Sequence, residues 1–235
     1  MQLFYTPDIT QATTNFTFDK TESKHIIKVL RKNTGDLLFI TNGNGELFTS
    51  EIIIGNEKSC TVKINQVKTK KKPWNYYLHV AIAPTKNINR FEWFLEKATE
   101  IGIDEITPIL CDRSERKVIK MDRLSRILES AMKQSLKFQL PKLNNLTSFS
   151  DFIEQSKIEN LFIAHCENTD KKTLKENLKP QQNATILIGP EGDFSTAEIK
   201  NAINNNFKPI SLGESRLRTE TAGIMATQLV SFINQ

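Results

Sequence analysis

The pattern that most constrains the fold of this chain is a regular alternation of short apolar runs and helical stretches after residue 73. Parallel strands need long crossover connections, usually a helix, whereas antiparallel strands can be joined by tight turns. The alternation therefore predicts an α/β fold with a parallel sheet covered by helices. The expected strands are 77–83, 105–110, 161–164, 185–188 and 209–212, and the expected helices begin near Asn89, Asp122, Ser148, Lys171, Ser195 and Thr219.

The first seventy residues follow a different pattern, that of a mostly β domain. Short β-branched or aromatic runs predict strands at 3–5, 37–40, 46–54 and 60–67, and residues 22–31 predict a helix. The sequence Asn42-Gly43-Asn44-Gly45 is typical of a hairpin turn, because Asn and Gly tolerate positive φ. A basic stretch that ends in a proline, 68–73, is typical of a linker. We therefore expect two domains, 1–72 and 73–235.

The net charge of +5 is concentrated in the first of these domains. Residues 1–72 carry eleven Lys and Arg against seven Asp and Glu, whereas the rest of the chain carries 21 against 20. This split indicates a basic module joined to an almost neutral one, although many proteins with such a net charge bind nothing anionic. The sequence has no apolar run near the ~20 residues that a membrane span needs. Its first residues also lack the features of a signal peptide, so we expect a soluble, cytoplasmic protein.

The cysteines and histidines give no sign of a metal centre. Cys60, Cys111 and Cys166 are each about fifty residues apart, and no pair has metal-ligand or redox spacing. We therefore expect no metal and no disulfide framework.

The strongest local signal is the segment 185–198, an apolar strand followed by a Gly/Pro-rich turn and a helix. Ser195 and Glu198 have the spacing of a capping box, so residues 189–193 should form the loop at the carboxyl end of a sheet strand. The dinucleotide and P-loop fingerprints are both absent. Glu191 and Asp193 would repel a phosphate, so the loop suits a neutral or cationic small molecule. A well-capped tight turn without a ligand is the alternative.

A second segment, 210–225, repeats this arrangement. A strand runs into a Gly turn, Arg216 and Arg218 follow, and Thr219 or Thr221 could cap the next helix. Turns at the ends of neighbouring strands can meet and form one pocket. Ordinary connecting loops with exposed arginines are the alternative.

Five motifs in register resemble one family. Ile-Gly-Pro-Glu-Gly-Asp-Phe-Ser at 188–195 and Leu-Gly-Glu-Ser-Arg-Leu-Arg-Thr-Glu-Thr-Ala at 212–222 are similar to the two signature loops of the RsmE family. Members of this family are 16S ribosomal RNA uracil-N3 methyltransferases of the SPOUT class. The remaining motifs lie at 25–31, 97–102 and 130–141, so the resemblance covers nearly the whole chain.

This resemblance implies a small PUA-like β-barrel followed by an α/β domain with a C-terminal trefoil knot. It also implies a homodimer that binds S-adenosylmethionine in the knot and methylates N3 of a uridine of 16S ribosomal RNA in the small ribosomal subunit. The implied cofactor-binding residues are Ile188, Gly189, Gly192, Leu212, Gly213, Leu217, Arg218, Thr219, Glu220, Thr221 and Ala222.

The resemblance also suggests roles in the reaction. Arg218 could stabilise the developing uracil anion, and Glu191 or Glu220 could accept the N3 proton. The residues expected to contact RNA are His25, Arg31, Lys86, Arg90, Lys97, Arg113, Arg126, Lys133 and Lys137. The alternatives are a related methyltransferase that acts on another RNA or on a ribose hydroxyl, and a non-catalytic RNA-binding assembly factor. The missing phosphate fingerprints weaken a third, a dehydrogenase or nucleotide-dependent enzyme.

Two positions depart from the family pattern. Asp193 stands where a further glycine is common, which makes the turn less permissive or uses the tolerance of Asp for unusual φ. Lys137 stands where an arginine is usual, so a fork-like contact with RNA is in doubt there.

Overall fold

The computed structural model describes residues 1–156 and 160–235, and the chain divides into two compact units. The first unit contains residues 1–73 and 132–140, and the second contains residues 74–131 and 141–235.

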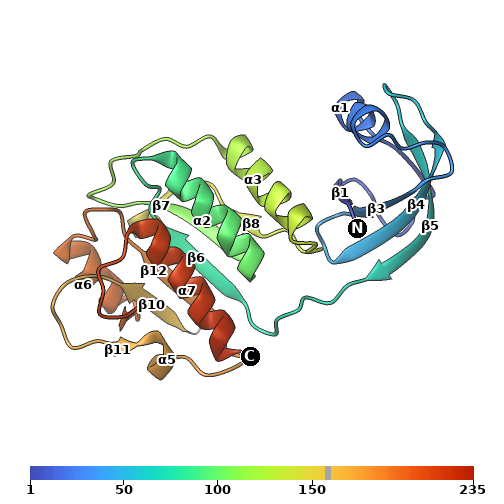
Figure 1. Ribbon diagram of the computed structural model, residues 1–235. Helices are drawn as coiled ribbons and strands as arrows, with labels where there is room; N and C mark the ends of the chain where they lie inside the picture. The colour runs from blue at the N-terminus through green and yellow to red at the C-terminus, as the bar shows by residue number, and fades with distance from the viewer. Residues whose placement is uncertain (157–159) are drawn as a thin grey trace. The chain divides into compact units, whose positions relative to one another are not determined.

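The first unit is built on a curled five-stranded sheet (Figure 1). Its strand order is β1-β3-β4-β5-β2, with β1 parallel to β3 and the other pairs antiparallel. The edges are β1 and β2, so hydrogen bonds between the described strands do not close the sheet into a barrel. The strands are β1 (Leu3–Tyr5), β2 (Asn15–Thr17), β3 (Leu37–Thr41), β4 (Glu46–Ile54) and β5 (Thr61–Thr69).

The single helix expected at 22–31 is instead two short pieces. The α-helix α1 (Lys20–Lys24) continues into the π-helix η1 (His25–Val29), and Arg31 then takes a left-handed conformation with φ 56°. The side chain of Asp19 caps α1 by accepting the N–H of Glu22. One face of this helical segment packs on the sheet, where Ile26 joins a buried cluster with Phe4 and Phe48.

The predicted hairpin turn at 42–45 forms, and a distant segment pairs with it. Gly43 and Gly45 have φ of 77° and 84°, values that glycine adopts without strain. The N–H of Gly45 donates to the carbonyl of Phe138, and the N–H of Leu140 donates to the carbonyl of Gly43, each at 2.8 Å. These bonds explain why residues 132–140 belong to the first unit, which no local pattern indicated.

The second unit contains an eight-stranded sheet in which all the recorded pairings are parallel. The order is β11-β13-β10-β12-β6-β7-β8, with β9 also paired to β7. Every residue of β6 and β12 is buried, as expected for central strands with helices on both faces. The strands are β6 (Leu78–Ile82), β7 (Glu105–Leu110), β8 (Lys142–Leu143), β9 (Thr147–Ser148), β10 (Leu161–Ala164), β11 (Lys172–Thr173), β12 (Ala184–Ile188) and β13 (Lys208–Ser211).

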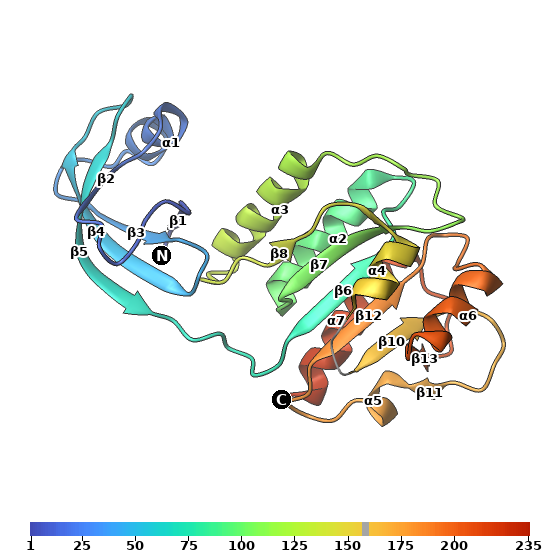
Figure 2. The same cartoon turned by 180° about the vertical axis from the view of Figure 1, so that it is seen from behind.

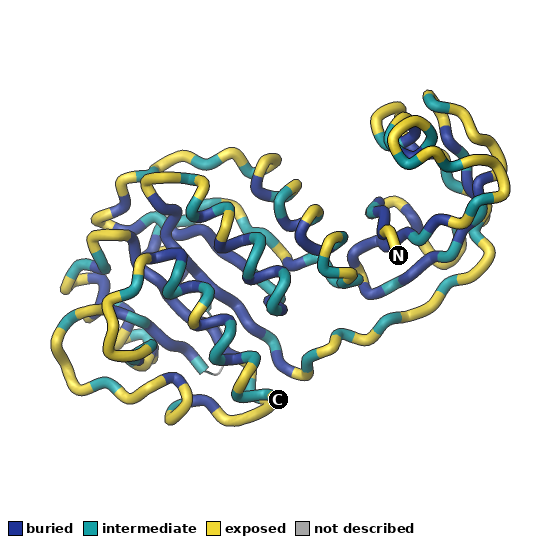
Figure 3. Tube along the Cα trace, in the orientation of Figure 1, coloured by how far each residue is buried: buried dark blue, intermediate teal, exposed yellow. Residues whose placement is uncertain are grey.

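Helices cover both faces of this sheet. Figure 1 shows α2 (Ile88–Ile101) and α7 (Thr219–Ile233) on one face, and Figure 2 shows α4 (Phe149–Gln155) and α6 (Thr196–Asn204) on the other. The core beneath α4 and α6 includes Phe152, Ile163, Leu187 and Ile199. In Figure 3 the central strands are buried along their length, while the helices alternate between buried and exposed residues. The α/β fold predicted from the alternation is confirmed.

The remaining helices are α3 (Met121–Gln134) and α5 (Leu174–Asn177). The helix expected to run from 122 to about 137 ends earlier, because Leu136 is left-handed with φ 53°. Leu136 is 42% exposed and does not continue the apolar stripe formed by Leu124, Leu128 and Met132. In the described ranges, no helix is long and apolar enough to cross a membrane.

A polar cluster occupies the sheet edge where the strands begin. Glu105 at the start of β7 accepts hydrogen bonds from the Tyr77 hydroxyl, from Lys142 Nζ and from Asn144 Nδ2. His79 Nε2 lies 2.7 Å from Thr107 Oγ1. Burial alone would raise the pKa of Glu105, but the bonds from Lys142, Tyr77 and Asn144 lower it to about 2.

Burial lowers the pKa of His79 from 6.5 to about 4, although the nearby charge of Glu105 opposes this. Because the folded-state pKa is the lower one, the unfolded chain takes up the proton first as the pH falls. The contribution of neutral His79 to stability is therefore complete above pH 6.5 and is lost between pH 6.5 and 4.

We predict that His79→Gln, which cannot titrate, flattens this pH dependence. Between pH 7.5 and pH 5, the free energy of unfolding should fall in the wild type by about 2 kcal/mol more than in the variant. Urea denaturation at the two pH values measures both losses. Some pH dependence should persist in the variant, because burial also lowers the pKa of His165. Equal losses in the two proteins would contradict the assignment to His79.

Candidate functional site

The parallel sheet brings the carboxyl ends of its strands to one edge, and a hollow lies there. Residues from both predicted signature loops line a cavity of about 260 Å³. An adjoining cavity of about 730 Å³ shares part of its wall with the first. The shared residues are Ala164, Cys166, Asp193, Arg216, Leu217 and Ala222.

Most of the residues expected to bind the cofactor line one or both of these cavities. The smaller cavity includes Ile188, Gly189, Leu217, Arg218, Thr219 and Ala222, and the larger includes Gly192, Leu212, Gly213, Leu217 and Ala222. Glu220 and Thr221 line neither of them. Both belong to the first turn of α7, where Glu220 is buried beside α2.

A third loop, 164–171, contributes to both cavities and was missed in the sequence. Ala164 and Cys166 line both, and His165, Glu167 and Lys171 line the larger one. The segment has no Gly-rich turn and no motif. Only its place in the sequence could have indicated its role, because it follows a strand whose carboxyl end lies at the same sheet edge.

The 189–195 loop is a tight turn that leads directly into α6. The Asp193 N–H donates to the Pro190 carbonyl at 2.9 Å, and Asp193 is left-handed with φ 61°. Ser195 and Glu198 form the predicted capping box. Gly189 allows the close approach of Phe194, because a Cβ at Gly189 would lie 3.0 Å from that ring.

Neighbouring loops hold this turn from several sides. The Arg113 guanidinium, from the loop after β7, donates to the carbonyls of Gly192 and Phe194 at 2.9 and 3.3 Å. The Lys86 N–H, from the loop after β6, donates to Glu191 Oε1 at 2.9 Å. These bonds fix the backbone of the turn at the position where it lines the cavity.

The start of α7 is tied to the same turn. The expected cap by Thr219 or Thr221 is wrong, because Arg218 is the N-cap residue and makes no side-chain capping bond. The hydroxyl of buried Thr219 donates instead to the Gly189 carbonyl at 3.0 Å. This bond links the two signature loops and explains why a threonine stands at the first position of the helix.

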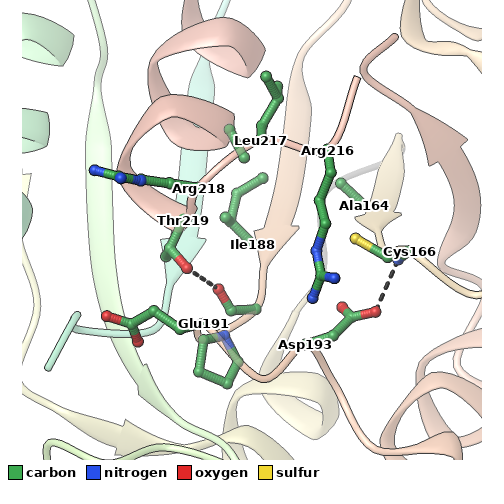
Figure 4. A pocket seen from close by; sticks show the side chains of 12 residues that line it. Ala164, Cys166, Ile188, Glu191, Asp193, Arg216, Leu217, Arg218 and Thr219 are labelled. Atoms are coloured by element: carbon green, nitrogen blue, oxygen red, sulfur yellow. Dashed lines mark hydrogen bonds between the residues drawn. The ribbon is translucent and has the colours of Figure 1, made fainter. Parts of the chain in front are cut away.

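The three residues with suggested catalytic roles lie in different surroundings. Arg218 is exposed at the cavity rim, and Figure 4 shows its side chain pointing away from Arg216 and Asp193. Glu191 also lines the cavity, but its carboxylate accepts the Lys86 N–H. Glu220 is only 5% exposed, with Arg90 Nε 3.7 Å from its Oε1, and its Oε2 has no hydrogen-bond partner among the described residues.

The residues expected to contact RNA lie on several elements, and many of them have partners within the chain. Lys86 pairs with Glu115 at 2.7 Å, and the hydrogen bond that Lys86 donates to this carboxylate raises the pKa of the lysine. Lys97 pairs with Glu96 and Glu100. The others are His25, 3.0 Å from Glu22; Arg31, exposed after η1; Arg90, paired with Glu220; Arg113, bonded to the 189–195 turn; exposed Arg126; and half-buried Lys133 and Lys137.

Comparison with known families agrees with this architecture. A family described as an RNA methyltransferase domain matches residues 70–231, and one described as an RNA methyltransferase PUA domain matches residues 18–65. The parallel sheet, the loops that meet at its carboxyl edge and these matches define the class of protein, an RNA methyltransferase.

Similarity to individual proteins identifies the family within this class. A ribosomal RNA small subunit methyltransferase E from Mesomycoplasma hyopneumoniae is 32% identical over 85% of this chain and 86% of its own length. The chain belongs to this methyltransferase E family, the RsmE family.

Solved structures agree with the family assignment. A Porphyromonas gingivalis protein named as a probable rRNA methyltransferase has a TM-score of 0.94 and 41% identity, covering 100% of this chain and 98% of its own. A methyltransferase from Legionella pneumophila, solved with bound S-adenosylmethionine, has a TM-score of 0.89 and 28% identity, with coverages of 99% and 97%.

We predict that Thr219→Val destabilises the second unit by about 1–3 kcal/mol, because it leaves the Gly189 carbonyl without its hydroxyl donor. Chemical denaturation measures the change. Thr227→Val is a matched control on the same helix, since the buried Thr227 hydroxyl donates to the Gly223 carbonyl at 2.8 Å. The Gly223 carbonyl also accepts the regular helix hydrogen bond. Thr227→Val should therefore lower the free energy of unfolding by less than Thr219→Val. An equal or smaller loss in Thr219→Val would contradict the linking role.

Proposed function

We propose that this chain transfers a methyl group from S-adenosylmethionine to N3 of a uridine in 16S ribosomal RNA. The observation that carries the proposal is that the two loops with the family signature, 188–195 and 212–222, meet at one cavity at the carboxyl edge of a parallel sheet. That edge is where open α/β sheets bind their ligands. A ribosomal RNA substrate supports a cytoplasmic location for this reaction.

The chemistry of the cavity wall suits this cofactor. Ile188, Leu217 and Ala222 supply apolar surface for a ring or an alkyl chain, and backbone groups of the tight turn border the same space. Glu191 and Asp193 add carboxylates that a positively charged sulfonium tolerates and a phosphate does not. The cofactor-binding residues expected from the sequence are accordingly proposed as a set, with Glu220 and Thr221 acting from behind the cavity wall.

S-adenosylmethionine supplies an electrophilic methyl group on its sulfonium sulfur. The chain must remove the N3 proton, because the neutral imide is a poor nucleophile, and must stabilise the charge that develops on the uracil oxygens. Arg218 stands at the cavity rim and provides a positive charge for this purpose. The carboxylate that accepts the proton is Glu191 or Glu220. The exposed carboxylate of Glu191 is accessible to the uracil ring of the substrate, whereas the carboxylate of Glu220 is buried.

We assign the two domains different tasks. Residues 1–72 are proposed to dock ribosomal RNA, which fits their basic surplus and the PUA match. Residues 73–235 are proposed to bind the cofactor and carry out methyl transfer. The basic residues named above would contact phosphates, so RNA affinity should fall steeply as salt rises.

Dimerisation and the trefoil knot are part of the same proposal. Large apolar side chains are exposed on the two helices that cover one face of the sheet. Trp93 on α2 is 47% exposed, and Met225 and Phe232 on α7 are 37% and 62% exposed. A second copy would bury them. The knot is supported by the chain path, since β13 lies beyond β10 while the following helix α7 packs back against β6 and β12.

We predict that deleting the gene removes N3-methyluridine from 16S ribosomal RNA and that the wild-type chain restores it. Mass spectrometry of nuclease-digested RNA measures the modification. Persistence of N3-methyluridine in the deletion strain would contradict the proposed activity. Loss of a different methylated nucleoside would favour a related methyltransferase. An unchanged RNA together with no binding of S-adenosylmethionine would favour an assembly factor.

In the same experiment, Arg218→Ala should lower the methylation rate by about 10²–10³-fold, the usual effect of removing one charge-stabilising group. Lys200→Ala, an exposed change on α6, is the control and should leave the rate unchanged. Normal methylation by Arg218→Ala, with normal cofactor affinity, would exclude its role.

A further inference from the structure

Asp193 adopts a backbone conformation that favours glycine. Its φ is 61°, in the left-handed region that a residue with a Cβ adopts only at a cost. Glycine adopts this region without strain, so this chain accepts a local conformational cost by having an aspartate here. The carboxylate must therefore make interactions that glycine cannot.

Those interactions are two hydrogen bonds from backbone N–H groups. Asp193 Oδ1 accepts the N–H of Phe194 at 2.9 Å, which stabilises the turn itself. Asp193 Oδ2 accepts the N–H of Cys166 at 2.8 Å, and Cys166 belongs to the loop after β10. Hydrogen bonds to an ionised group are stronger than those between neutral groups, so the two bonds offset the backbone cost.

The loop that contains Cys166 has few other connections to the 189–195 turn. Thr196 Oγ1 donates to Glu167 Oε1 at 2.8 Å, but Thr196 is the exposed first residue of α6 and lines neither part of the cavity. Lys171 Nζ donates to the carbonyls of His165 and Glu167, which orders the loop internally without joining it to the turn. Among the described residues, the bond between Asp193 and Cys166 is therefore the side-chain connection from this loop to the turn in which both partners line the cavity.

Both partners of this bond line both parts of the cavity. Figure 4 shows the dashed bond from Cys166 to Asp193, with the Arg216 side chain of the second signature loop pointing toward the same carboxylate. Asp193 thus lies where three loops approach one another, those after β10, β12 and β13. A change there alters the shape of the cavity without removing any of the residues with proposed catalytic roles.

We infer that Asp193 is a positioning residue that fastens the 164–171 loop to the signature turn and so sets the affinity for S-adenosylmethionine. This inference rests on the proposed function, because that function supplies the ligand of the cavity. A glycine at this position would keep the turn but release the third loop.

The experiment compares Asp193→Gly and Asp193→Asn with the wild-type chain. Asp193→Gly suits the left-handed backbone and should fold normally, while it removes both side-chain bonds. It should weaken S-adenosylmethionine binding about tenfold in calorimetry and increase amide hydrogen exchange in peptides containing residues 164–168. Asp193→Asn keeps one side-chain oxygen and loses the charge. Its affinity for S-adenosylmethionine should therefore lie between those of the wild type and Asp193→Gly.

Asn206→Gly is the matched control. Asn206 is another left-handed residue, with φ 68°, but it follows α6 and lines neither part of the cavity. It should change neither binding nor exchange at 164–168. Unchanged exchange in Asp193→Gly would overturn the fastening role, and unchanged affinity would overturn its link to the cofactor. If the wild type itself bound no S-adenosylmethionine, the proposed function would fail, while the exchange measurement would still decide whether the loops are fastened.

Discussion

The parallel direction of the strands is the constraint on which the site depends. Because β6, β7, β10, β12 and β13 all run the same way, the loops that follow them emerge at one edge. Segments distant in sequence, such as 164–171 and 212–218, are thereby brought to one cavity. The same alignment buries β6 and β12 on both faces, so the core that stabilises the unit also fixes the site.

Loops that meet at such an edge must satisfy their own backbone groups, and this requirement explains several side chains. The Thr219 hydroxyl, the Arg113 guanidinium and the Asp193 carboxylate each bond to main-chain atoms of a neighbouring loop. The sequence alone suggested RNA contact for Arg113. In the structure its guanidinium donates to the carbonyls of Gly192 and Phe194 in the signature turn, so this side chain also holds the cavity wall in place.

Long apolar runs made much of the fold predictable. The strands β4, β7 and β10 have the expected bounds because each is rich in β-branched, aromatic or other apolar residues. The two- and three-residue strands β2, β8, β9 and β11 were not predicted, since pairing with neighbours, rather than local pattern, defines them. The π-helical turn at 25–29 was also not predicted, because its residues have the composition of an ordinary α-helix.

The candidate site was predictable where glycines and caps mark a turn. The capping box of Ser195 and Glu198 and the positive φ of Asp193 both follow from residue chemistry. The role of the 164–171 loop was not predictable, because nothing in its composition distinguishes it from an ordinary connecting loop. Nor was the burial of Glu220 against α2, which depends on how two helices pack on the sheet.

Amide hydrogen exchange with and without S-adenosylmethionine shows whether the three loops form one binding site for this ligand. We expect saturating S-adenosylmethionine to slow exchange together at 164–171, 188–195 and 212–222, while the polar cluster around Glu105 at the opposite sheet edge is unaffected. Protection confined to that opposite edge, or no protection in any of the three loops, would contradict it.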